Sequence, residues 1–227
     1  MPACCDSDVS FSIESSSQKK YYLPFDLPRS EGGIYADRNK SHIDSRQELN
    51  TIKKIYERLG EANVSRTIYY SKLYNAVKFF NHSYNEHWTL LKTTLAFTAL
   101  ESLFSDSDKS EVSYKVALRT ACFLFPKNAQ KRADAFTFIR RGYEIRSLFV
   151  HGSDVEKQIN KIMKKFETEK GVDWYDFHYH YVLGLSEIVS QCLLKVLLNK
   201  TYFDFFTKEK HKPDDEKKFF DNLVLNL

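Results

Sequence analysis

The sequence predicts an all-α protein, a helical bundle with an irregular N-terminal arm. Proline and glycine, which interrupt helices, are scarce, because the 227 residues include only five prolines and seven glycines. Apolar residues recur mostly at helical spacing, and the alternating runs typical of strands are few. Hydrophobic residues make up 42% and charged residues 28% of the chain, which excludes a wholly disordered protein. The length fits one domain with an appended segment.

The first forty residues differ in composition from the rest. They contain three of the five prolines, the polar cluster SIESSSQKK and the Gly32-Gly33 turn, which are typical of irregular backbone. We therefore divide the chain into an arm at 1–40, a helical bundle at 41–207, and a charged break with a short tail helix at 208–227.

Three helices are expected in the first half of the bundle. The segment from about 44 to 60 carries apolar residues at helical spacing, and Gly60 is a natural residue to end it. A second helix spans roughly 64–81. The third, about 86–104, is apolar on nearly every side, which predicts the buried centre of the bundle.

In the second half of the bundle, a proline and a glycine mark the ends of two helices. Pro126 ends the fourth helix and Gly152 ends the fifth. Ser153 and Glu156 then form a capping box that begins a sixth helix. The fourth, fifth and final long helices are expected at 111–125, 129–151 and 173–206.

Charge, cysteine content and missing motifs exclude several classes of protein. The 34 Lys and Arg against 30 Asp and Glu leave a net charge of +4, too small for a histone-like nucleic-acid binder. The four cysteines form no CxxC pair, which excludes a zinc ribbon. No GxGxxG, P-loop or GxSxG motif occurs. Without a secretory signal or an uninterrupted apolar run of membrane-spanning length, we expect a cytoplasmic protein with no membrane contact.

The expected fifth helix is the most basic part of the chain. Between residues 127 and 146, six basic side chains stand against two acidic ones, an excess equal to the net charge of the whole chain. Such a helix suits a phosphate backbone, although a solvated face with extended arginines explains the same charge. The candidate RNA-binding residues are Lys131, Arg132, Arg140 and Arg141.

His151 stands at the C-terminal end of this helix. The negative end of the helix dipole favours a protonated imidazole there, and a histidine beside arginines is suited to proton transfer on a phosphodiester. A histidine that only caps the helix is the alternative. Arg146 lies about 140° around the axis from His151. Both reach one phosphate only if the helix ends at His151 or a second copy completes the site.

The segment Arg146-Ser-Leu-Phe-Val-His151-Gly152 resembles the Arg-x4–6-His signature of the HEPN superfamily. FTALESLF (97–104), SYKVALRTACFLF (113–125) and a Tyr-x-x-Arg-Ser…His-Gly stretch from Tyr143 extend the resemblance to the Apea-like HEPN branch, over roughly residues 86–200. This resemblance implies a helical bundle that forms homodimers, with two motifs meeting in a cleft. It also implies a metal-independent endoribonuclease that needs no cofactor.

By this resemblance, four residues form the catalytic site. Arg146 and His151 match the signature, and Ser147 occupies the polar position where many members carry Asn, Asp or His. Glu101 matches an acidic position of the branch, and an acid in so apolar a helix needs a cationic partner, either Arg146 or Arg119. In the implied reaction the ribose 2′-OH attacks the adjacent phosphorus. His151 moves the proton and Arg146 stabilises the developing charge.

The partners follow from the same resemblance, and two alternatives stay open. Active HEPN proteins often belong to toxin–antitoxin or antiviral defence systems, which implies RNA, a second copy and an antitoxin or regulatory protein as partners. The alternatives are a catalytically silent HEPN domain that binds RNA or protein, and a structural dimerisation module using the FFDNLVLNL tail. No metal site is expected, because only Asp176 and His180 of the DFHYH region can share a helix face.

Overall fold

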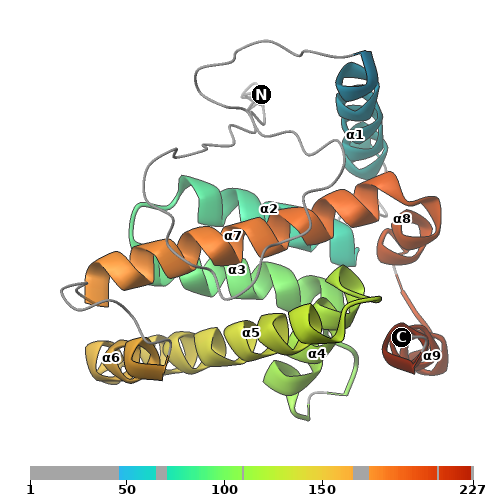
Figure 1. The fold of residues 1–227 in the computed structure, drawn as a ribbon. Coiled ribbons are helices and arrows are strands. Elements are labelled where there is room, and N and C mark those ends of the chain that lie inside the picture. The colour runs from blue at the N-terminus through green and yellow to red at the C-terminus, as the bar shows by residue number, and fades with distance from the viewer. Residues whose placement is uncertain (1–45, 65–70, 109, 166–173, 209, 226–227) are drawn as a thin grey trace, which may run out of the picture.

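The computed structural model describes residues 46–64, 71–108, 110–165, 174–208 and 210–225. Within these ranges the chain forms nine α-helices and no strand (Figure 1), which confirms the predicted all-α class. The expected arm at 1–40 lies outside the described residues. The helices are α1 (Arg46–Val64), α2 (Lys72–Asn85), α3 (Thr89–Phe104), α4 (Val112–Leu124), α5 (Ala129–Val150), α6 (Val155–Lys165), α7 (Trp174–Leu198), α8 (Lys200–Phe206) and α9 (Pro213–Leu225).

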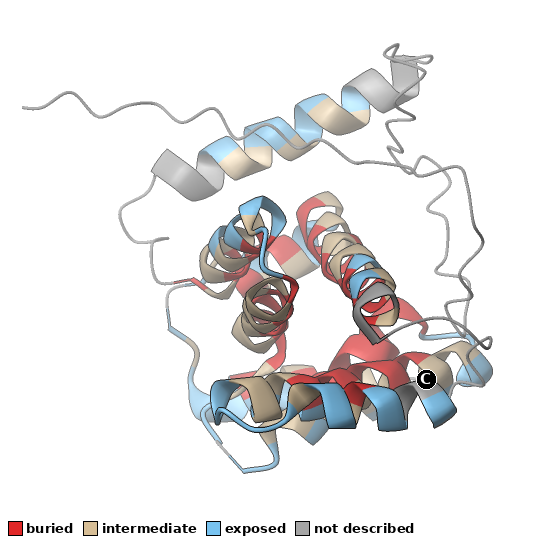
Figure 2. Ribbon diagram, turned by 90° about the vertical axis from the view of Figure 1, so that its left-hand side faces the viewer, coloured by how far each residue is buried: buried red, intermediate tan, exposed pale blue. Residues whose placement is uncertain are grey.

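The core lies where α3 packs against α2, α4, α5 and α7. α3 buries eight of its 16 residues, as its nearly continuous apolarity predicts. Figure 2 shows the buried positions on the sides that the central helices turn toward one another. Over Phe177–Leu198, α7 is long and apolar enough to cross a membrane, but 61% of the apolar window is buried inside the bundle. Its apolarity therefore serves the packing of the core.

Gly142 allows α5 to approach α3 and α7 closely. A Cβ atom at this position would lie 2.8 Å from Cε2 of Phe97, and closer still to Cζ of Phe97 and the hydroxyl of Tyr181. The Tyr181 hydroxyl donates a hydrogen bond to the backbone oxygen of Phe138, and the two rings stack with centroids 4.2 Å apart. Only glycine fits this helix crossing.

Two helix boundaries predicted in the first half are wrong. α1 continues through Gly60 to Val64, because a glycine weakens a helix by only about 1 kcal/mol and does not have to end it. α2 begins at Lys72 instead of near residue 64. The side chain of Ser71 accepts a hydrogen bond from the backbone N–H of Tyr74 at 3.1 Å, and this N-cap sets the start of the helix.

One helix length and one N-cap predicted in the second half are also wrong. The helix expected over 173–206 is two helices, because the side chain of Asn199 accepts a hydrogen bond from the N–H of Tyr202 at 3.1 Å and caps α8. Ser153 is not the N-cap of α6. Asp154 takes that role and accepts the backbone N–H three residues later at 3.0 Å, so the predicted capping box is shifted by one residue.

A cluster of charged side chains holds α9 against α2 and α4. α9 begins at Pro213, earlier than the predicted tail helix, because proline suits the first position of a helix. The buried carboxylate of Glu216 lies 2.8 Å from Nζ of Lys72 and accepts a backbone N–H of the α3–α4 loop at 3.2 Å. The guanidinium of Arg119 lies 4.1 Å from the ring centre of Phe220. The C-terminal helix is thus part of the bundle.

Candidate functional site

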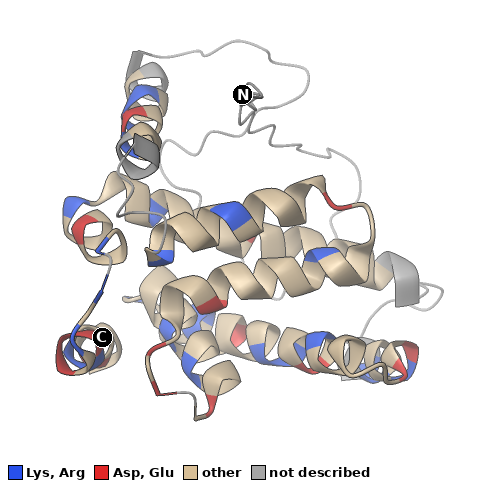
Figure 3. Cartoon of the chain, turned by 180° about the vertical axis from the view of Figure 1, so that it is seen from behind, with Lys and Arg blue, Asp and Glu red and all other residues tan. Residues whose placement is uncertain are grey.

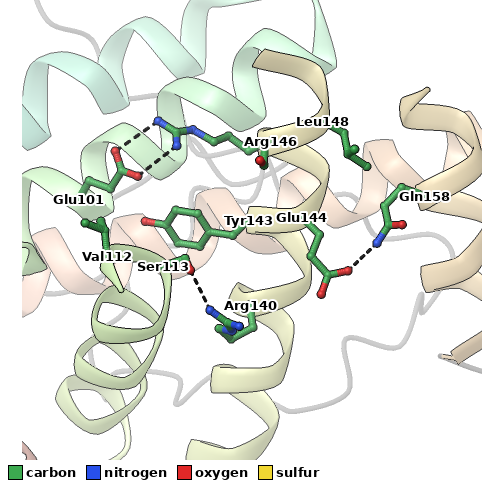
Figure 4. Close-up of a pocket in the computed structure, with 10 residues that line it drawn as sticks. Glu101, Val112, Ser113, Arg140, Tyr143, Glu144, Arg146, Leu148 and Gln158 are labelled. Atoms are coloured by element: carbon green, nitrogen blue, oxygen red, sulfur yellow. Dashed lines mark hydrogen bonds and ion pairs between the residues drawn. The ribbon is translucent and has the colours of Figure 1, made fainter. Parts of the chain in front are cut away.

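A cavity of about 580 Å³ opens between α3, α4, α5 and α6 (Figure 4). It contains three of the four predicted catalytic residues, and His151 is not among the side chains that line it. Two arginines and two glutamates give it a mixed charge. The lining residues are Glu101, Val112, Ser113, Arg140, Tyr143, Glu144, Arg146, Ser147, Leu148 and Gln158.

Arg146 and Glu101 form an ion pair with two contacts between α5 and α3. Nη1 of Arg146 lies 3.4 Å from Oε1 of Glu101, and Nη2 lies 3.4 Å from Oε2. The expectation that Glu101 needs a cation is confirmed, and the cation is Arg146. Arg119, the other candidate, instead donates to the backbone oxygen of Phe104 at 2.7 Å and pairs with Asp106 at 2.5 Å.

The Glu101–Arg146 pair is accessible to solvent. The two side chains keep 21% and 29% of their surface exposed, and both contacts are longer than the 2.7–2.9 Å typical of charge-assisted hydrogen bonds. An anionic ligand entering the cavity can therefore replace Glu101 on the guanidinium of Arg146.

Tyr143 lies between the two arginines of the cavity wall. Its ring packs against Phe97 with centroids 4.5 Å apart, and its hydroxyl points toward the carboxylate of Glu101 (Figure 4). Burial raises the pKa of Tyr143, and the negative charge of Glu101 raises that pKa further, so the phenol stays protonated. Tyr143 is not among the site residues predicted from the sequence, although it lies three residues before Arg146 in the Tyr-x-x-Arg-Ser stretch.

A Schellman motif ends α5 at His151. Gly152 has a φ of +67°, and its N–H donates to the backbone oxygen of Phe149 at 3.1 Å. The N–H of Ser153 donates to the backbone oxygen of Leu148 at 2.8 Å. These are the two hydrogen bonds of the motif, with glycine in the left-handed position that it favours. The predicted stop at Gly152 is confirmed, and the side chain of His151 is exposed.

His151 and Arg146 lie on different sides of α5. His151 is four positions after Ser147 in the sequence, so these two side chains share a face of the helix. Arg146 is about 140° away from His151 and is held by Glu101 on α3. Within one chain, His151 therefore lies on the same face of α5 as Ser147, and His151 and Arg146 point in different directions.

The predicted basic face is not one surface. Arg140 lines the cavity and donates to Oγ of Ser113 at 2.7 Å. Arg132, near the N-terminal end of α5, donates to two backbone oxygens just after α4, at 3.1 and 3.0 Å. Lys131 and Arg140, nine residues apart, point to opposite sides of the helix, about 180° apart, and Arg141 is partly buried. Figure 3 shows basic and acidic residues interspersed along α5 and α6.

His178 belongs to the core. It is fully buried, and its Nε2 lies 3.0 Å from Oγ1 of Thr93. Among the residues that the structure describes, no three His, Cys, Asp or Glu side chains gather as metal ligands. The pair considered from the sequence, Asp176 and His180, includes a side chain outside the described set.

Acid should destabilise the fold through His178. Burial lowers the pKa of His178 from 6.5 to about 4, so between these values the unfolded chain binds a proton that the folded chain does not. The free energy of unfolding is therefore highest above pH 6.5 and decreases as the pH falls toward 4. Urea unfolding between pH 7.5 and 4.5 measures this. His178→Gln should flatten the pH dependence, and an unchanged pH dependence in that variant would exclude His178 as its cause.

Comparisons with known proteins assign no family to the chain. No family model matches it, and no curated protein and no solved structure matches it significantly. The function therefore has to be inferred from the residues of the site.

Proposed function

We propose that the chain is a metal-independent endoribonuclease of the HEPN type, active as a homodimer. The observation that carries this proposal is the accessibility of His151. The imidazole is exposed at the end of α5, one helical turn beyond Ser147, which lines the cavity. A general acid or base must reach its substrate, and a histidine sealed in the core, such as His178, does not meet this condition.

In the proposed reaction, the ribose 2′-oxygen attacks the adjacent phosphorus and the bond to the 5′-oxygen of the next nucleotide breaks. His151 accepts the 2′-hydroxyl proton, and the protonated imidazole then delivers a proton to the leaving 5′-oxygen. Arg146 exchanges Glu101 for the phosphate and donates two hydrogen bonds to the phosphorane oxygens. The products are a 2′,3′-cyclic phosphate and a 5′-hydroxyl. The substrate is RNA because DNA has no 2′-OH.

A second copy completes the site in this proposal, because Arg146 and His151 of one chain diverge. Two exposed apolar side chains at the same end of the bundle support an interface there. Trp88 meets Phe149 edge-on with ring centroids 4.9 Å apart and stays 56% exposed, and Val150 stays 54% exposed. Exposed aromatic and aliphatic groups of this kind are typical of protein interfaces. An antitoxin or other regulatory protein is the further partner that this class of enzyme would need.

Cleavage of RNA in the presence of EDTA tests the proposal. Replacing His151 with alanine should lower the cleavage rate by about 10²- to 10⁴-fold, which is the usual contribution of a positioned acid or base. The measurement is the initial rate on a labelled single-stranded RNA, together with identification of the cyclic-phosphate end. His82→Ala is the matched control, since His82 is an exposed histidine on α2. Equal rates for His151→Ala and wild type, or activity that EDTA abolishes, would exclude this mechanism.

A catalytically silent domain that binds RNA or a partner protein is the second candidate. The observation that favours it is the Glu101–Arg146 pair, because a carboxylate from the same chain already neutralises the guanidinium. In that case purified dimers should bind RNA without cleaving it. Glu101→Gln would then change the Kd for RNA, and the variant, like wild type, would not cleave it.

A further inference from the structure

An exposed aromatic ring stands beside Arg140, one of the residues that line the cavity. Tyr114, in the first turn of α4, is 44% exposed, and Phe136 of α5 braces it with ring centroids 5.4 Å apart at 77°. The guanidinium of Arg140 lies 6.0 Å from the centre of the Tyr114 ring. Arg140 is positioned by its hydrogen bond to Ser113 at 2.7 Å. The ring and the cation are thus held in place by two helices.

Arg140 differs in charge balance from Arg146, the other arginine of the cavity, and from Arg119 of α4. Arg119 and Arg146 each pair with a carboxylate, whereas Arg140 has no carboxylate within 4.0 Å among the described residues. The two acids that line the cavity have other partners. Glu101 pairs with Arg146, and Glu144 accepts a hydrogen bond from Gln158 at 2.5 Å. The charge of Arg140 is therefore available to an anionic ligand.

From this juxtaposition we infer that Tyr114 and Arg140 form a nucleotide-binding subsite for single-stranded RNA, in which a base stacks on Tyr114 and its phosphate binds Arg140. Base–aromatic stacking requires a base that is not paired in a duplex, and it tolerates any sequence because every base has a flat face. Arg140 supplies the phosphate contact, which is likewise independent of sequence. The subsite thus binds single-stranded RNA in preference to duplex RNA and does not distinguish between sequences.

The position of the subsite along α5 gives the path of the strand, and this step rests on the proposed function. His151 follows Arg140 by eleven residues, about 20° from three full turns, so both lie on one side of the helix and about 16 Å apart along it. Ser147 lies on that side between them. At the ~3.4 Å rise of a stacked strand, this distance corresponds to about five nucleotide steps. The strand would run along α5, with one nucleotide at Tyr114 and the cleaved phosphate near His151.

Binding of an uncleavable strand tests the subsite separately from the chemistry. The probe is a fluorescein-labelled ten-nucleotide RNA with 2′-O-methyl groups, which lacks the attacking hydroxyl, and the readout is fluorescence anisotropy. Tyr114→Ala should raise the Kd at least about fivefold, the lower bound for losing one stacked base. Tyr114→Phe keeps the ring and should bind like wild type. The matched control is Tyr179→Ala, because Tyr179 is a similarly exposed tyrosine on α7.

Salt and strandedness provide two further readouts. Arg140→Ala should lower the slope of log Kd against log salt by about 0.7, the value for one phosphate contact on a single strand. A blunt duplex of the same length should bind more weakly than the single strand, and Tyr114→Ala should not alter its affinity. A duplex that binds as tightly as the single strand would overturn the inference.

Failure of the subsite and failure of the proposed function give different results. If His151-dependent cleavage is present but Tyr114→Ala leaves both the Kd of the probe and the KM for RNA unchanged, the subsite is wrong and the nuclease stands. If wild type binds the probe through Tyr114 but cleaves no unmodified RNA, the subsite stands and the nuclease is wrong. An equal loss of affinity in Tyr114→Phe would show that the hydroxyl acts, and would overturn the stacking role. No binding of any RNA by wild type would overturn the subsite.

Discussion

Replacing Gly142 with alanine should lower the free energy of unfolding by about 3 kcal/mol or more. The new methyl group would overlap the ring of Phe97 and the hydroxyl of Tyr181, and both rings are packed in the core and cannot swing away. Overpacking of this kind usually costs about 1–3 kcal/mol. Here the hydrogen bond from Tyr181 to Phe138 is strained as well. The gain of about 1 kcal/mol in helix propensity does not offset this loss.

Urea unfolding monitored by circular dichroism measures the effect, and α1 offers a matched control. Gly60 is also a glycine inside a helix, but nothing lies within 4 Å of the position that its Cβ would take. Gly60→Ala should therefore stabilise the protein by about 0.5–1 kcal/mol. Adding Phe97→Leu to Gly142→Ala should recover part of the loss, because the smaller side chain leaves room for the methyl group. If Gly142→Ala also stabilises the protein, as Gly60→Ala should, then α5 does not approach Phe97 and Tyr181 as closely as described.

The second large effect is expected at Glu216. Glu216→Ala leaves the ammonium of Lys72 and the backbone N–H of Ser107 without their carboxylate partner. The ion pair is 2.8 Å long, and its side chains are only 19% and 8% exposed. Removing one partner of a buried pair typically costs about 3–5 kcal/mol, and we expect about 3 kcal/mol here because Lys72 keeps some contact with water. α9 should also detach more readily than the rest of the bundle.

Two measurements follow the detachment of α9. Urea unfolding gives the total loss of stability, and limited trypsin digestion after Lys208 and Lys210 gives the rate of local opening. The control is Asp221→Ala, which removes an exposed carboxylate from the same helix and should change stability by less than about 0.5 kcal/mol. Equal trypsin sensitivity of Glu216→Ala and Asp221→Ala would show that the buried pair does not hold α9.

The sequence predicts the central helices well and the capped boundaries poorly. α3, α4 and α5 were expected within a few residues of their observed ends, because apolar spacing, Pro126 and Gly152 mark them. Ser71 and Asn199 were missed, because a single side-chain hydrogen bond decides where a helix begins and many Ser and Asn residues never make that bond. Gly60 does not end α1 as the sequence predicts, because an exposed helix tolerates a glycine.

The candidate site was predictable in part. The pairing of Glu101 followed from the cost of burying a lone carboxylate in an apolar helix, and the structure selects Arg146 over Arg119 as its partner. Counting 100° per residue could have shown in advance that Lys131 and Arg140 face opposite ways. The roles of Tyr143 and Tyr114 were not predictable, because they depend on how α5 packs against α3 and α4.

The way α5 ends has a consequence for the chemistry of its last side chain. A histidine at a helix terminus often satisfies the final carbonyl groups itself and is then committed to the backbone. Here the amides of Gly152 and Ser153 already occupy the oxygens of Phe149 and Leu148. Because backbone amides already satisfy these carbonyl oxygens, the imidazole of His151 does not have to. Both of its ring nitrogens can therefore form hydrogen bonds with a ligand that arrives from solvent.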